Sequence, residues 1–177
     1  MKEQQKKYEL TDEFIEIFGG KKLYRIKALV SFGVVVAGQL GGFIESEKNL
    51  DQSLSSNAWV SGDARVYGDA RVYGDAWVSG DAEVYGDALV SGDARVRSHA
   101  VISEHKMIFW ASNVGSENGT LTVFNGKDGL IVTRGCFAGT VDEFLAKSAK
   151  VHDDKTKNEY KLLIEVAKSR ILGVKDE

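Results

Sequence analysis

Residues 58–105 read AWVSGD-ARVYGD-ARVYGD-AWVSGD-AEVYGD-ALVSGD-ARVRSH-AVISEH, eight units of six residues that follow one another without a break. Each unit has alanine at its first position and valine or isoleucine at its third. The third-position series is Val60, Val66, Val72, Val78, Val84, Val90, Val96 and Ile102. A short fixed period indicates that each unit is one structural element, which buries its apolar side only by stacking on its neighbours.

Within a unit, the residues alternate as they do in a strand. Trp59 would point outward, Val60 inward and Ser61 outward, which is a period of two. The Gly62-Asp63 pair that follows is a turn signal, because glycine accepts positive φ and aspartate hydrogen-bonds its own backbone. Each unit is therefore predicted to be a short strand followed by a corner.

A second, longer period sets the expected register. Trp59-Val60-Ser61 recurs at residues 77–79, and Arg65-Val66-Tyr67 is echoed by Glu83-Val84-Tyr85, so one coil takes 18 residues. Stacked coils lie about 4.8 Å apart. We therefore expect Trp59 beneath Trp77, Tyr67 beneath Tyr85, and Arg65 beside Glu83.

The repeat resembles the hexapeptide-repeat proteins from Ala58 to Ser103. That resemblance implies a left-handed parallel β-helix with three units per coil. The expected fold is mainly β, with a β-rich N-terminal cap at residues 1–50, the β-helix at residues 51–104, and strands plus two helices at residues 105–177. Leu54 lies six residues before Val60, which predicts one irregular unit ahead of the clear ones.

The segments on either side of the repeat carry their own signals. Apolar runs at 14–18 and 23–29 flank Gly19-Gly20, which predicts a hairpin. The stretch LYRIKALVSFGVVVAGQLGGFIESEKNL, followed directly by the repeat, resembles the opening of a group of bacterial and phage-encoded hexapeptide-repeat proteins that are largely uncharacterised. This resemblance implies a phage or prophage origin and says little about activity.

After the repeat, strands are expected at residues 107–114, 120–124 and 130–134. Thr140 and Glu143 form a capping box that starts a first helix, and a second helix is expected from about Lys155 to Leu172. The unit GCFAGTVDEFLAKSAKVH…NEYKLLIEVAKSRI resembles a C-terminal module of phage and prophage proteins. It would act as a cap or as a docking module.

Composition narrows the class of partner. The net charge of −3 gives no strong signal for nucleic acid or for a membrane surface. The single cysteine excludes an internal disulfide framework, and the N-terminus has no apolar segment typical of a signal peptide. The simplest expectation is a cytoplasmic protein of a bacterial host.

An enzymatic function has to be considered, because the hexapeptide-repeat proteins include acyltransferases. Hexapeptide-repeat acyltransferases resemble one another in using a histidine base, usually with an inserted loop over the acyl donor, and no long insertion interrupts these units. His99 and His105 occupy the same phase of successive units, so they would lie on different faces and would not share a metal ion. Cys136 is expected to be a buried structural thiol. We therefore expect no catalytic residue, no metal and no cofactor.

Outward-facing aromatic and arginine side chains are the strongest functional signal, because surfaces of this kind are typical of protein interfaces. The face that carries Trp59 and Trp77 would be covered either by a terminal region or by another subunit. The expected binding or oligomer-interface residues are Trp59, Trp77, Arg65, Tyr67, Arg71, Tyr73, Glu83, Tyr85, Arg95 and Arg97.

The resulting prediction is a non-enzymatic, self-associating binding protein, with a homotrimer favoured. It would bind or block a host factor, such as a host-defence protein, or take up a small anionic ligand such as a signalling nucleotide. The alternatives are a hexapeptide-type acyltransferase and a structural virion or scaffold protein.

Overall fold

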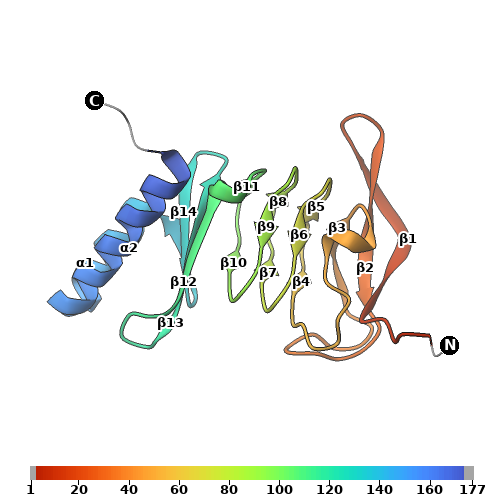
Figure 1. Cartoon of the computed structure of the whole chain (residues 1–177), viewed down its shortest axis with the longest axis horizontal. Coiled ribbons are helices and arrows are strands. Elements are labelled where there is room, and N and C mark those ends of the chain that lie inside the picture. The colour runs from red at the N-terminus through yellow and green to blue at the C-terminus, as the bar shows by residue number, and fades with distance from the viewer. Residues whose placement is uncertain (1–2, 174–177) are drawn as a thin grey trace.

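A computed structural model describes residues 3–173 of the chain. Three regions follow one another along the long axis of the molecule (Figure 1). An N-terminal group of strands lies at one end, a parallel β-helix of about three turns lies in the middle, and a four-stranded sheet with two helices lies at the other end. This arrangement confirms the predicted mainly β fold.

The β-helix is built from eight strands of two residues, one in each six-residue unit. They are β4 (Trp59–Val60), β5 (Arg65–Val66), β6 (Arg71–Val72), β7 (Trp77–Val78), β8 (Glu83–Val84), β9 (Leu89–Val90), β10 (Arg95–Val96) and β11 (Val101–Ile102). Each pairs in parallel with the strand 18 residues away, so that Trp59 lies opposite Trp77 and Arg65 opposite Glu83. The predicted coil length and register are therefore confirmed.

The inside of the β-helix is a column of small and β-branched side chains. The alanines and the valine or isoleucine residues of all eight units are between 0 and 1 % exposed. At each corner from Gly62 to Gly92 the glycine has positive φ, the conformation for which the Gly-Asp pairs were expected. The last regular corner instead uses Ser98, at φ +59°.

The N-terminal strands extend one face of the β-helix. β1 (Tyr8–Ile17) and β2 (Lys21–Ala28) form the expected hairpin, and β3 (Leu40–Ile44) joins them to the repeat. The sheet order is β1-β2-β3-β5-β8-β11, and Ile44 of β3 lies opposite Val66 of β5. The first coil thus begins before the recognisable repeat.

The irregular unit of this first coil differs from the one expected. After the short 3-10 helix η1 (Glu47–Asn49), Leu50 pairs with Val72 and is 1 % exposed, whereas Leu54 is 49 % exposed. The inward positions Leu50 and Val60 are therefore ten residues apart, whereas those of the regular repeat are six apart. Leu54 lies in this longer corner and does not fill the core.

A buried lysine closes the longer corner. The Lys7 side chain is fully buried, and its ammonium group donates hydrogen bonds to the carbonyl oxygens of Ser56 (3.3 Å) and Ala58 (3.0 Å). It also lies 4.8 Å from the centre of the Phe32 ring. Burial lowers the pKa of Lys7 to about 8, against a smaller opposing effect of the Asp51 carboxylate.

This pKa makes the stability of the protein rise with pH in the range above 8. Between the folded pKa of about 8 and the unfolded value near 10.5, the unfolded chain holds more protons, so the free energy of unfolding increases with pH. Lys7→Met removes this titration. In urea titrations, we expect the unfolding free energy of the natural protein, relative to that of Lys7→Met, to rise by about 2 kcal/mol from pH 7.5 to pH 9.5. Lys6→Met, at an exposed neighbouring position, serves as the control, and parallel curves for Lys7→Met and the natural protein would contradict the assignment.

The C-terminal sheet caps the other end of the β-helix. After η2 (His105–Met107), it consists of β12 (Ile108–Val114), β13 (Gly119–Gly126), β14 (Gly129–Arg134) and β15 (Phe137–Thr140), of which β15 was not expected. Thr122 accepts a hydrogen bond from the Arg95 backbone N–H, and Thr133 donates one to the Arg95 carbonyl. These threonines satisfy part of the otherwise open edge of the last coil.

The two helices cover the far side of this sheet (Figure 1). They are α1 (Val141–Val151) and α2 (Asp154–Leu172), and α1 starts at the predicted capping box, with Thr140 and Glu143 bonded reciprocally. The helices and the sheet bury a second core that includes Leu121, Phe144 and Tyr160. Ser148 is the buried residue on the last turn of α1.

Candidate functional site

The tryptophan face is mostly occupied by the chain itself. Trp59 is fully buried beneath Tyr8 and Phe32, whose ring centres lie 6.3 and 5.4 Å from that of Trp59. Of the two alternatives for this face, coverage by a terminal region is therefore correct at Trp59, and Trp59 is no longer a candidate contact residue. Trp77 is half-buried, and its indole N–H donates to the Ser61 hydroxyl at 3.1 Å.

The two arginines that end the tryptophan column also bind within the chain. Arg95 donates from its guanidinium group to the Asp75 carbonyl at 2.8 Å. Arg97 donates to the carbonyl of Gly135, in the turn between β14 and β15, at 2.8 Å. Arg97 thereby connects the β-helix to the C-terminal sheet.

A second face carries the tyrosine column, whose two rings are half-buried and reach the surface. The rings of Tyr67 and Tyr85 stack at a centroid distance of 5.1 Å and an interplanar angle of 6°. Arg65 lies 3.5 Å from the Glu83 carboxylate, and the Tyr67 hydroxyl lies 3.4 Å from it. Partial burial and the nearby Glu83 raise the pKa of Tyr67 to about 12, so its hydroxyl remains protonated at neutral pH.

The third face has only β6 and β9 and is the most open. Arg71 is exposed, Tyr73 is 40 % exposed, and Leu89 is half-buried. Together with Lys48 and Asp51 they line a shallow groove of about 340 Å³. The arginine, tyrosine and leucine side chains here have the composition of an interface.

The histidines of the repeat lie apart from one another. His99 is exposed, with its Nδ1 atom 3.7 Å from the Asp81 carboxylate. His105 is exposed in η2, on the next corner. Across the described residues 3–173, no group of three His, Cys, Asp or Glu side chains is arranged to hold a metal ion.

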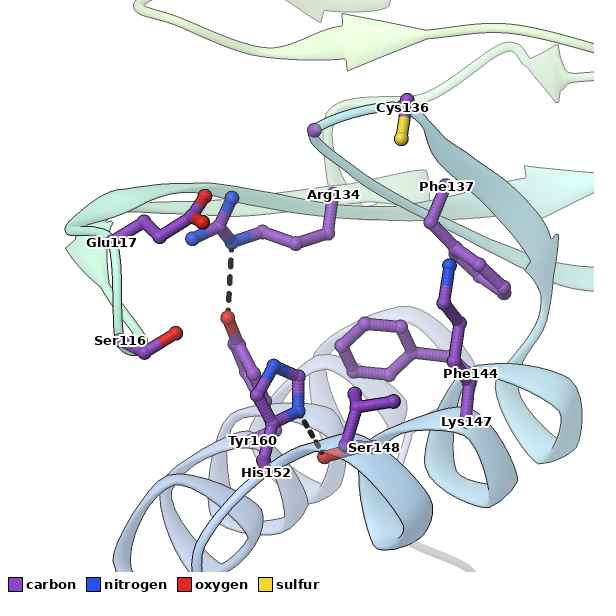
Figure 2. Close-up of a pocket in the computed structure, with 12 residues that line it drawn as sticks. Ser116, Glu117, Arg134, Cys136, Phe137, Phe144, Lys147, Ser148, His152 and Tyr160 are labelled. Carbon is purple, nitrogen blue, oxygen red and sulfur yellow. Dashed lines mark hydrogen bonds between the residues drawn. The ribbon is translucent and has the colours of Figure 1, made fainter.

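A pocket of about 190 Å³ opens in the C-terminal region, where the sequence indicated none (Figure 2). Its walls come from four segments, namely the turn after β12, the turn between β14 and β15, α1 with the residue that follows it, and α2. The lining residues are Ser116, Glu117, Arg134, Gly135, Cys136, Phe137, Phe144, Lys147, Ser148, Val151, His152 and Tyr160. The pocket thus combines aromatic walls with basic side chains.

Hydrogen bonds fix the orientation of two basic groups in this pocket. Arg134 Nε donates to the Tyr160 hydroxyl at 3.1 Å, and His152 Nδ1 lies 3.0 Å from the Ser148 hydroxyl, as the dashed lines in Figure 2 show. Ser148 is only 3 % exposed, so its hydroxyl serves to hold the imidazole and is a poor candidate for a nucleophile.

Cys136 corrects one prediction about this region. Its side chain is exposed, whereas we expected a buried structural thiol. The reason is local, because Cys136 follows Gly135 (φ +55°) at the tip of the turn between β14 and β15. Cys136 and His152 line the same pocket, but no hydrogen bond joins them in the described part of the chain.

Comparison with known families supports the solenoid fold. The model of the YdcK beta solenoid repeat matches residues 64–80, which is about one coil. A comparison with curated proteins gives no match. Among the described residues, neither helix is both long enough and apolar enough to cross a bilayer.

Proposed function

We propose that this chain is a non-enzymatic β-helical binding protein that self-associates through the open faces of its β-helix. The observation that carries this proposal is the uneven coverage of the aromatic columns. The N-terminal region buries Trp59 completely, whereas the stacked Tyr67 and Tyr85 are only half-buried, as is Leu89, and Tyr73 is 40 % exposed.

A second copy of the chain is the occupant that fits these faces best. The tyrosine column and the Arg71–Tyr73–Leu89 groove lie on adjacent faces of one prism, separated by a single corner. If the tyrosine column of one subunit contacts the groove of the next, the subunits close into a ring. A closed ring leaves no open faces from which fibres would grow. A prism with three faces favours a trimer.

The partner of the assembled protein is proposed from the resemblances to phage and prophage proteins. A small accessory protein of that origin acts in the bacterial cytoplasm by binding, and the target would be a host factor such as a defence protein. The rigid β-helix would hold the N-terminal strands and the C-terminal helices at a fixed separation, which suits a protein whose role is to occupy a surface.

Self-association is tested by the mass in solution. We expect light scattering at micromolar concentration to give a mass near three times the chain mass of 19.4 kDa. Tyr73→Asp places a charge in the proposed interface and should give the monomer mass, whereas Leu162→Asp, at an exposed position of α2, should leave the assembly intact. A natural protein that is monomeric would contradict the proposal, and a dimer would retain the interface with a different stoichiometry.

The binding role is tested by native mass spectrometry of the protein purified from its bacterial host. A stoichiometric host protein that is released when its contact surface is mutated supports the proposal. Bound acyl-coenzyme A that turns over would replace it with the acyltransferase alternative. Incorporation into purified virions would replace it with a structural role.

A further inference from the structure

The pocket of the C-terminal region is lined by two basic side chains, Arg134 and Lys147. Within residues 3–173, neither Arg134 nor Lys147 forms an ion pair. Glu117 is the only carboxylate among the lining residues. Arg134 is half-buried, and a bound anion would form charge-assisted hydrogen bonds with its guanidinium group.

Two hydrogen bonds hold the Arg134 guanidinium group in one orientation. Its Nε–H bonds to the Tyr160 hydroxyl, and one terminal nitrogen reaches the Val114 carbonyl at 3.5 Å. A guanidinium group has five N–H donors, so these two bonds leave donors free for a ligand. Figure 2 shows that Arg134 spans one side of the pocket, opposite α1, the His152 residue that follows it, and α2.

The remaining walls are apolar. Phe137 and Phe144 pack at a ring distance of 5.5 Å, and Val151 is 62 % exposed at the rim. The Lys147 ammonium group lies 5.3 Å from the centre of the Phe137 ring, so a positive charge adjoins this apolar wall. A site with an apolar wall on one side and a fixed cation on the other selects ligands that have both characters.

We propose that this pocket binds a small organic anion, with an aromatic or aliphatic body against Phe137 and Phe144, a carboxylate or phosphate head on Arg134, and the Lys147 ammonium group adding positive charge beside the apolar wall. The volume of about 190 Å³ limits the body to roughly the size of one ring. This site is independent of self-association, because its residues belong to the C-terminal sheet and helices and not to the open faces of the β-helix.

The single cysteine gives a direct measure of occupancy. Cys136 lines the pocket, is exposed, and is the only cysteine in the chain, so its alkylation by neutral iodoacetamide reports on this site alone. We expect saturating benzoate or phenyl phosphate to slow alkylation of the full-length protein several-fold. Benzyl alcohol lacks the charge and inorganic phosphate lacks the body. Each should need an about tenfold higher concentration to give the same protection. The more protective of the two organic anions identifies the head group.

Two variant pairs test the location. Lys147→Gln should weaken binding of the preferred anion about three- to tenfold, whereas Lys150→Gln, on the same helix but outside the pocket, should change binding less than twofold. Val151→Asp places a repelling charge at the rim and should weaken binding at least about tenfold, with Leu162→Asp as its control. All four positions lie at the helix surface, so the variants should fold.

The proposal is overturned by any of three results. One is the absence of saturable protection by either organic anion up to about 10 mM. Another is equal protection by benzyl alcohol. The last is unchanged affinity in both Lys147→Gln and Val151→Asp, which would place the bound anion elsewhere on the protein.

Discussion

Val78→Asp should abolish folding of the β-helix. Val78 is fully buried between Val60 and Val96, with which it is paired in register on both sides. An aspartate at this position has no hydrogen-bond donor or cation within the column of alanine and valine side chains. Burial of an unpaired carboxylate costs several kcal/mol even when it takes up a proton, which is comparable with the whole stability of a domain of this size.

The expected observation is loss of the cooperative unfolding transition in circular dichroism, with most of the protein aggregated or degraded. Ser79→Asp introduces the same charge one residue later, at a half-buried position just after β7, and should lower the melting temperature by only a few degrees. If Val78→Asp melts like Ser79→Asp, then the inward assignment of the valine column is incorrect.

The β-helix could be predicted in detail because its period is explicit in the sequence. Repetition at six residues fixes which side chains point inward, and the echo at 18 residues fixes which residues stack. The pairing of Trp59 with Trp77 and the stacking of Tyr67 on Tyr85 follow from these two numbers alone. Tertiary contacts with other parts of the chain are not needed to set this local geometry.

Features that depend on distant residues could not be predicted in the same way. The burial of Trp59 depends on Phe32, in a loop whose position is set by the antiparallel pairing of β2 with β3. The place of Leu50 in the first coil was hidden because the corner that follows it has four extra residues, which shifts the apparent phase onto Leu54.

The pocket was missed for the same reason. Arg134, Lys147 and Tyr160 come from a strand, a first helix and a second helix, and no spacing in the sequence relates them. One weak signal was present, since Arg134 ends the apolar run LIVTR and directly precedes a Gly-Cys turn. An arginine at that point is consistent with a surface position, and only the fold shows that helices face it.

Gly86→Ala should destabilise the protein more than Gly62→Ala, although both glycines have positive φ. At the first corner of the repeat, a Cβ atom at Gly62 would lie 3.4 Å from the backbone of Gly80, which is an ordinary contact. At Gly86 the added Cβ atom would clash with the carbonyl oxygen of Ser103. The cause is the end of the repeat, where the chain leaves β11 for η2 and brings this carbonyl over the corner.

Both substitutions carry the cost of a left-handed backbone, about 1–2 kcal/mol for a residue with a Cβ atom. Gly86→Ala adds an overlap with backbone that is held by the hydrogen bond from Tyr85 to Ile102, at a cost of about 1–3 kcal/mol more. Urea titrations should therefore show Gly86→Ala less stable than Gly62→Ala by about 2 kcal/mol, with equal slopes. Equal stabilities would mean that the segment from β11 to η2 moves aside at little cost, and that the C-terminal sheet does not hold the last coil rigidly.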